Sequence, residues 1–133
     1  MGIQSSTVKI GGTVSTTSGT DTNMLTKGGT LNELVTVLDD SSEFIDQIRF
    51  RFNVVDPKVS ASAPNGYTQQ RSIVKVVFPL GLDNGKRTTN TLEIKLSCDP
   101  ETQASEKDSY MVLGAQLLSL PDFQAFFQEQ SLV

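Results

Sequence analysis

Three segments in the middle of the chain alternate strictly between apolar and polar residues, and this pattern constrains the fold more than any other feature. The segments are 47–55 (QIRFRFNVV), 71–78 (RSIVKVVF) and 91–97 (TLEIKLS). Because successive side chains of a strand point to opposite faces, such alternation is typical of antiparallel strands that are covered on one side only. The sequence therefore predicts an antiparallel sheet with one apolar and one polar face.

The N-terminal third is less clearly patterned. Residues 7–10 and 13–17 are β-prone and flank Gly11-Gly12, which predicts an N-terminal hairpin. The polar residues 18–30 predict a loop. Segment 31–38 (LNELVTVL) has apolar residues at helical spacing, but its Val-Thr-Val favours a strand, and we favour the strand. With the alternating segments, this gives an antiparallel sheet of about five strands.

Proline and glycine residues mark where these strands end. Pro79 has no backbone N–H for the sheet, so it predicts the end of a strand or a position at the sheet edge. The following segment, 81–89 (GLDNGKRTT), predicts a flexible loop with Asn84-Gly85 at its tip.

The pattern changes from strand to helix after residue 98. Asp99-Pro100 suits the N-cap and first position of a helix. Ser119-Leu120-Pro121 would break this helix and begin a second one. The first helix carries an apolar stripe of Tyr110, Leu113, Gly114, Leu117 and Leu118. Strands followed by helices are the order of an α+β fold, and we expect a single domain over residues 1–133.

The last helix is unusually apolar for a chain terminus. Phe123, Phe126 and Phe127 share one of its faces. This surface either folds back on the sheet of its own chain or docks on a second subunit, as large terminal apolar surfaces often do. The candidate dimer-interface residues are Leu117, Leu118, Phe123, Phe126 and Phe127.

Charge is unevenly distributed along the chain. The formal net charge is −4, yet residues 47–95 hold eight cations against three anions. The remaining residues hold three cations against twelve anions, so the middle of the chain is basic and its flanks are acidic. An acidic total is unlike a general nucleic-acid binder, but one basic face is compatible with it. The alternative is charge scattered over an ordinary solvated surface.

Several classes of chemistry lack the residues that they need. The chain has no histidine, which excludes Ser-His-Asp and Cys-His catalysis and histidine-bound metals. Cys98 is the single cysteine, so no internal disulfide can form, and its position predicts a small buried side chain. No phosphate loop or carboxylate cluster with metal-ligand spacing is present, and we expect no cofactor. No signal peptide or apolar run long enough for a membrane span is apparent, so we expect no membrane partner.

One set of side chains carries chemical meaning. Cations recur on the polar side of all three alternating segments: Arg49, Arg51, Arg71, Lys75 and Lys95. Guanidinium and ammonium groups on an open sheet face suit contacts with nucleic-acid phosphates. Their neighbours Gln47, Asn53 and Thr91 could read the edges of unpaired bases.

The order and spacing of these segments resemble a known family, the coat proteins of single-stranded RNA bacteriophages. The resemblance rests on the Gly11-Gly12 hairpin, QIRFRFNVV, RSIVKVVFP, GLDNGKR, TLEIKLS and the helical residues 97–133, and it covers essentially the whole chain. It implies an interlocked homodimer with a continuous sheet, whose copies build an icosahedral shell. It also implies that the inner sheet face binds genomic RNA and an RNA hairpin that represses replicase translation.

The resemblance assigns roles to particular residues. The RNA-binding face would comprise Gln47, Arg49, Arg51, Asn53, Arg71, Ile73, Lys75, Thr91, Glu93 and Lys95. We expect contacts between dimers at the loop tip, which comprises Asp83, Asn84, Gly85, Lys86 and Arg87. The implied location is the virion, assembled in the bacterial cytoplasm. The rival interpretation is a small adhesin-like binding module without nucleic acid, and an enzyme is a distant third.

Overall fold

A computed structural model describes residues 6–11, 19, 22, 24–38 and 46–132. The chain divides into two compact units, one formed by residues 19–100 and the other by residues 1–18 together with 101–133. The first unit holds the sheet and the second holds the helices. A single domain over residues 1–133 stays a prediction.

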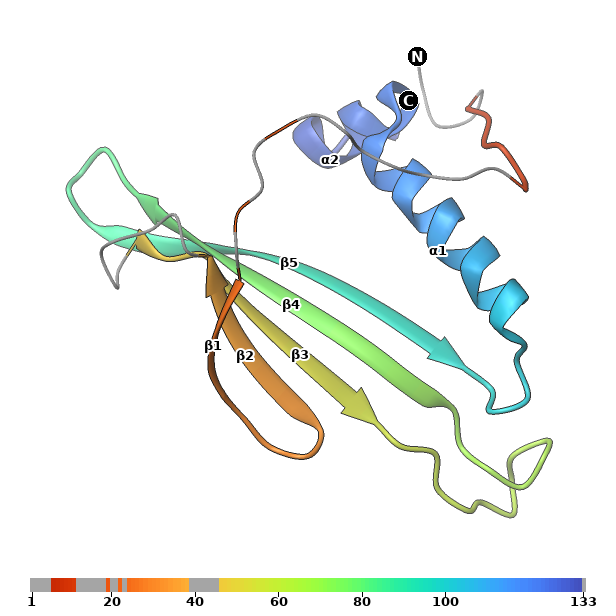
Figure 1. The fold of residues 1–133 in the computed structure, drawn as a ribbon. Coiled ribbons are helices and arrows are strands. Elements are labelled where there is room, and N and C mark those ends of the chain that lie inside the picture. Colours follow the sequence, from red (N-terminus) through yellow and green to blue (C-terminus); the bar gives the residue numbers. More distant parts are fainter. Residues whose placement is uncertain (1–5, 12–18, 20–21, 23, 39–45, 133) are drawn as a thin grey trace. The chain divides into compact units, whose positions relative to one another are not determined.

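The sheet unit is an antiparallel meander of five strands (Figure 1). Each strand pairs with its neighbours in sequence, so the spatial order is β1-β2-β3-β4-β5. The strands are β1 (Met24–Gly29), β2 (Glu33–Leu38), β3 (Arg49–Val55), β4 (Gln70–Gly81) and β5 (Arg87–Cys98). The three alternating sequence segments form β3, β4 and β5, which confirms the predicted antiparallel sheet.

Strand register assigns each side chain to a face. Phe52 pairs with Leu34 and Val74, and Val74 pairs with Ile94. We call the side of the sheet that carries this row the apolar face. Phe50 lies next to Phe52 on it, with the two rings stacked 6.2 Å apart. Apolar side chains on one face of every strand from β2 to β5 are the physical reason for this register, because a shift by one residue would turn them all to the other side.

The first two strands test the predictions for the N-terminal third. Segment 31–38 is a strand, because β2 lies within it. Residues 18–30 were predicted as a loop, but β1 lies within them, so that prediction is wrong. The sequence MLTKGG gives no alternation, and β1 is stabilised by its pairing with β2 rather than by its own pattern.

The connection between β4 and β5 is shorter than predicted. Pro79 does not end β4, which continues to Gly81. The last β4 residue that pairs with β3 is Val77, so at Pro79 strand β4 pairs with β5 alone. A proline, which lacks a backbone N–H, is tolerated at such an edge position. The loop itself is a tight turn in which the Leu82 N–H donates to the Lys86 carbonyl. Gly85 adopts a φ of 83°, the left-handed conformation that a three-residue hairpin loop requires at its last position.

The helical unit contains α1 (Ala104–Ser119), a short 3₁₀ turn at Pro121–Phe123 and α2 (Gln124–Glu129). Both predicted C-terminal helices are therefore present. The first helix begins later than predicted, because its N-cap is Gln103 and not Asp99. The Asp99 carboxylate belongs to the sheet unit, where it accepts a 2.7 Å hydrogen bond from the Asn65 amide.

The N-terminal segment does not form the predicted strand at residues 7–10. Instead the side chain of Gln116 on α1 satisfies the backbone of Lys9: the Lys9 N–H donates to Gln116 Oε1 at 2.6 Å, and Gln116 Nε2 donates to the Lys9 carbonyl at 2.7 Å. The Gln116 side-chain amide thus makes the backbone hydrogen bonds that a neighbouring strand would otherwise make to Lys9. Residues 13–17, the second half of the predicted hairpin, lie outside the described residues.

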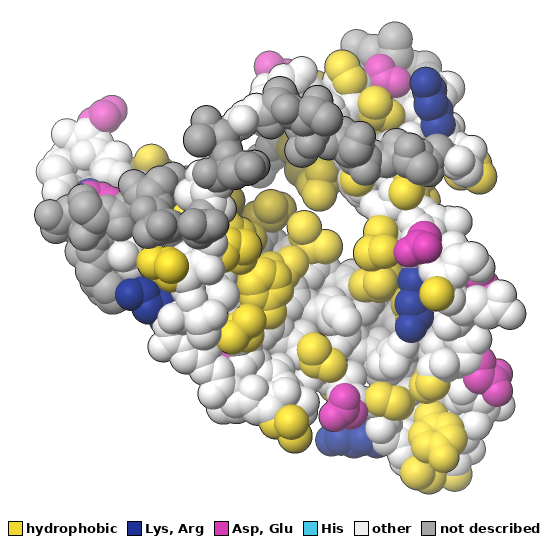
Figure 2. All heavy atoms as spheres, in the orientation of Figure 1, with side chains coloured by type: hydrophobic (Ala, Val, Ile, Leu, Met, Phe, Trp, Pro, Cys, Tyr) yellow, Lys and Arg dark blue, Asp and Glu magenta, His cyan; other side chains and the backbone are white. Residues whose placement is uncertain are grey.

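Few apolar side chains are buried in the described part of the chain. They are Val37, Val76, Cys98 and Phe123, so the prediction that Cys98 is buried is confirmed. On the apolar face, Leu34 and Ile94 remain 41% and 44% exposed. In Figure 2, yellow hydrophobic side chains gather over the strands on the side turned to the viewer. No described helix is long and apolar enough to cross a membrane.

Candidate nucleic-acid interface

The sheet register brings the predicted RNA-binding residues onto one face, opposite the apolar face. Asn53, Ile73 and Lys95 form one row across β3, β4 and β5. A second row contains Arg51, Lys75 and Glu93, and a third contains Arg49, Val77 and Thr91. Arg71 extends the face between Val55 and Ser97. We call this side the polar face. The juxtaposition follows directly from the alternation of the three strands.

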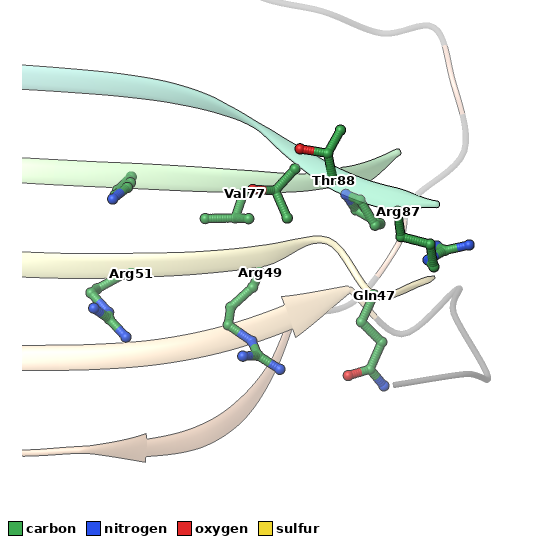
Figure 3. Close-up of a pocket in the computed structure, with 9 residues that line it drawn as sticks. Gln47, Arg49, Arg51, Val77, Arg87 and Thr88 are labelled. Carbon is green, nitrogen blue, oxygen red and sulfur yellow. The ribbon is translucent and has the colours of Figure 1, made fainter. Parts of the chain in front are cut away.

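A hollow of about 410 Å³ lies on the polar face near the β4–β5 turn. We call it the first hollow, and it is lined by Gln47, Arg49, Arg51, Lys75, Val77, Pro79, Arg87, Thr88 and Thr89. Gln47, Arg49 and Arg51 follow one another at alternate positions on the chain and point to the same side, as Figure 3 shows. Four cationic side chains therefore converge on one depression of the sheet.

Two of these cations form ion pairs with carboxylates in the described part of the chain. Arg51 Nε is 3.6 Å from a Glu33 oxygen, and both side chains are substantially exposed. Arg87 forms an ion pair and hydrogen bond with Asp46. Exposed ion pairs contribute little net energy in water, so an incoming phosphate can compete with either carboxylate. The surplus of cations keeps the first hollow positive and suited to an anion.

Arg87 is the functional candidate that the sequence prediction placed elsewhere. It was assigned to the loop tip, whereas the structure makes it the first residue of β5, paired with Gly81. Arg87, Thr89 and Thr91 occupy alternate positions of β5, so their side chains point to the same side of the sheet. Arg87 therefore points toward the polar face and lines the first hollow. Extending the alternation of the last strand backwards by four residues would have found it.

The remaining predicted residues of the polar face lie outside the first hollow. Arg71, Ile73 and Lys95 do not line it, nor do Asn53, Thr91 and Glu93. The predicted site is therefore one continuous face with a hollow at one end rather than a single pocket. Within the described ranges, no group of three or more metal-ligating side chains occurs.

The fold of the chain is similar to that of known particle-forming chains. No protein-family model matches the chain, and no curated protein matches its sequence. Among solved structures, the virus-like particle of bacteriophage GQ-907 is similar over 98% of this chain and 99% of that chain, with a TM-score of 0.87 and 26% identity.

Two further similar structures are much more distant in sequence. The virus-like particle of bacteriophage AVE019 has a TM-score of 0.66 at 8% identity, over 89% of this chain and 93% of that chain. For that of bacteriophage ESE058 the TM-score is 0.62 at 12% identity, over 83% and 86% of the two chains. These two likenesses concern the fold alone.

The class of protein follows from these matches: the chain has the α+β fold of bacteriophage coat proteins. The predicted resemblance to a phage coat protein is thereby confirmed, and the similarity to the GQ-907 particle extends over nearly the full length of both chains.

Proposed function

We propose that this chain is the coat protein of a single-stranded RNA bacteriophage, which assembles into a shell and binds RNA on its polar face. The likeness to the GQ-907 virus-like particle chain, which covers 98% of this chain and 99% of that chain, is the observation that supports assembly into a shell. The cations around the first hollow support the RNA partner, because phosphate contacts dominate the affinity for nucleic acid. The proposed location is the virion, with assembly in the bacterial cytoplasm.

The building block that we propose is a homodimer. Phe126 and Phe127 on α2 pack edge to face with ring centres 5.0 Å apart, yet they remain 39% and 53% exposed. Leu117 and Leu118 on α1 are exposed as well. Apolar surface of this extent is normally covered by a partner, and a second copy is the partner that shell assembly supplies. Repression of translation through an RNA hairpin is part of the same proposal.

Assembly gives the first test. The full chain produced in bacteria should sediment as a particle far larger than a dimer and carry strong absorbance at 260 nm from enclosed RNA. Treatment with ribonuclease should leave that RNA intact, because the shell protects it. A small, nucleic-acid-free species would contradict the proposal and favour the adhesin-like module.

The β4–β5 turn gives a second test, because we propose that it makes the contacts between dimers. Deleting Asp83 and replacing Lys86 with Thr leaves Asn84-Gly85 as a two-residue turn, which suits a tight hairpin. This variant should still form dimers but should yield no particles or particles of altered size, as measured by electron microscopy. The matched control is Lys58→Thr in the β3–β4 connection, which should assemble normally. Normal particles from the turn variant would remove the turn from the contacts.

A further inference from the structure

A β-bulge in the first strand brings an additional cation to the polar face. Thr26 pairs with Thr36 and Gly28 with Val35, which leaves Lys27 as an extra residue between two regular pairs. Bulges re-aim a side chain and are frequent beside functional sites. Lys27 lines a second hollow, of about 610 Å³, together with Gly28, Gly29, Thr30, Glu33, Val35, Gln47 and Arg49.

The two hollows are neighbours, because Gln47 and Arg49 line both of them. Together they extend across the strands from Lys27 on β1, over Arg49 on β3 and Lys75 on β4, to Arg87 on β5. Five strands at the usual spacing span about 19 Å. Arg71 and Lys95 line neither hollow, although they belong to the same polar face.

We propose that single-stranded RNA crosses the sheet transversely along the two hollows, with Lys27 and Arg87 as the cations at the two ends of its path. The proposal rests on the proposed RNA-binding function and specifies its route. A backbone of regularly spaced phosphates needs cations at successive positions, and the hollows supply one on each of four strands. Their volumes fall within the range of small-molecule pockets, so a nucleotide can enter each.

Two carboxylates beside the path compete with RNA phosphates for its cations. Glu33 lines the second hollow and pairs with Arg51, whereas Asp46 pairs with Arg87. In the absence of RNA these carboxylates occupy cations that phosphates would otherwise contact. RNA binding on this route therefore exchanges weak exposed ion pairs for phosphate contacts and releases counterions from the RNA.

The test compares two pairs of substitutions that remove equal charge from the same face. Lys27→Gln with Arg87→Gln changes both ends of the proposed path, and Arg71→Gln with Lys95→Gln changes residues away from it. The probe is a fluorescent 20-nucleotide oligouridylate, and its affinity for the full chain, purified free of RNA after disassembly of the particles, is measured from 50 to 300 mM salt. The first pair should reduce the slope of log affinity against log salt by about 1.4, or 0.7 per single-strand contact. The second pair should reduce it by less than half as much.

Two additional variants separate the possible failures. Arg49→Gln should weaken binding, and Asp46→Asn should strengthen it several-fold in the wild-type chain but not in an Arg87→Gln chain. If Arg49→Gln weakens binding while the Lys27 and Arg87 pair does not, RNA binding stands and the transverse route is wrong. A larger loss from the Arg71 and Lys95 pair also overturns the route. If none of these variants changes binding, RNA binding on this face and the route fail together.

Discussion

Replacing Arg49, Arg51 and Lys75 with Gln is expected to remove most of the RNA that the chain binds and to leave its fold intact. All three side chains line the first hollow, and none belongs to the apolar face. Each lost contact at an exposed site costs up to about 1 kcal/mol, so the three together should weaken RNA binding roughly 10- to 100-fold. The salt slope should fall by about 2.

The measurement is the RNA bound per subunit and its dependence on salt, with melting temperature as the check on folding. Substitutions of exposed residues usually change the free energy of unfolding by less than about 0.5 kcal/mol, so the melting temperature should stay close to that of the wild type. The matched control replaces Lys9, Lys58 and Lys107 with Gln, which removes the same charge outside the sheet. Equal RNA binding by both triple variants would show that net charge, and not the polar face, governs the affinity.

Replacing Phe126 and Phe127 with Ala should weaken the proposed dimer about a thousandfold. Each side chain is about half exposed in the single chain, so burial on dimerisation should contribute roughly 1 kcal/mol per ring, or about 4 kcal/mol for the four rings of a dimer. That energy corresponds to about three powers of ten in Kd. Analytical ultracentrifugation over a range of concentrations would measure the shift toward monomer.

A matched control distinguishes an interface from general surface hydrophobicity. Val59 is 82% exposed in the β3–β4 connection, and Val59→Ala should leave the dimer unchanged. Truncation after Leu118, which also removes the buried Phe123, is the more severe variant and should leave no soluble folded monomer. A dimer of wild-type affinity from the double alanine variant would exclude α2 from the interface.

The sequence predicted the central sheet because β3, β4 and β5 alternate on their own and need no other element to reveal their faces. The same alternation predicts that Arg49, Arg51 and Lys75 lie on one face, and the strand register confirms this prediction. The prediction of β2 required a choice between helical spacing and β-branched residues, and the β-branched residues gave the correct answer.

The features that the sequence did not predict depend on partners distant in the chain. Strand β1 has no pattern of its own and becomes a strand by pairing with β2. Residues 7–10 have the composition of a strand, but the backbone of Lys9 is bonded by Gln116 instead. Lys27 reaches the second hollow through a bulge that has no distinctive residue signature. Arg87 reaches the first hollow through an extension of β5, which continuing the alternation of that strand would have predicted.

The bond between Lys9 and Gln116 has a consequence for the order in which the molecule matures during translation. Each strand of the meander pairs with the next one along the chain, so the sheet can form strand by strand while the ribosome is still adding residues. The two hydrogen bonds to Gln116 join residues 107 positions apart, and they must wait until α1 has emerged. Residues 6–11 are thus synthesised before the sheet but reach their final contacts after it. A nascent or prematurely terminated polypeptide would carry this segment undocked, which distinguishes it from a finished copy.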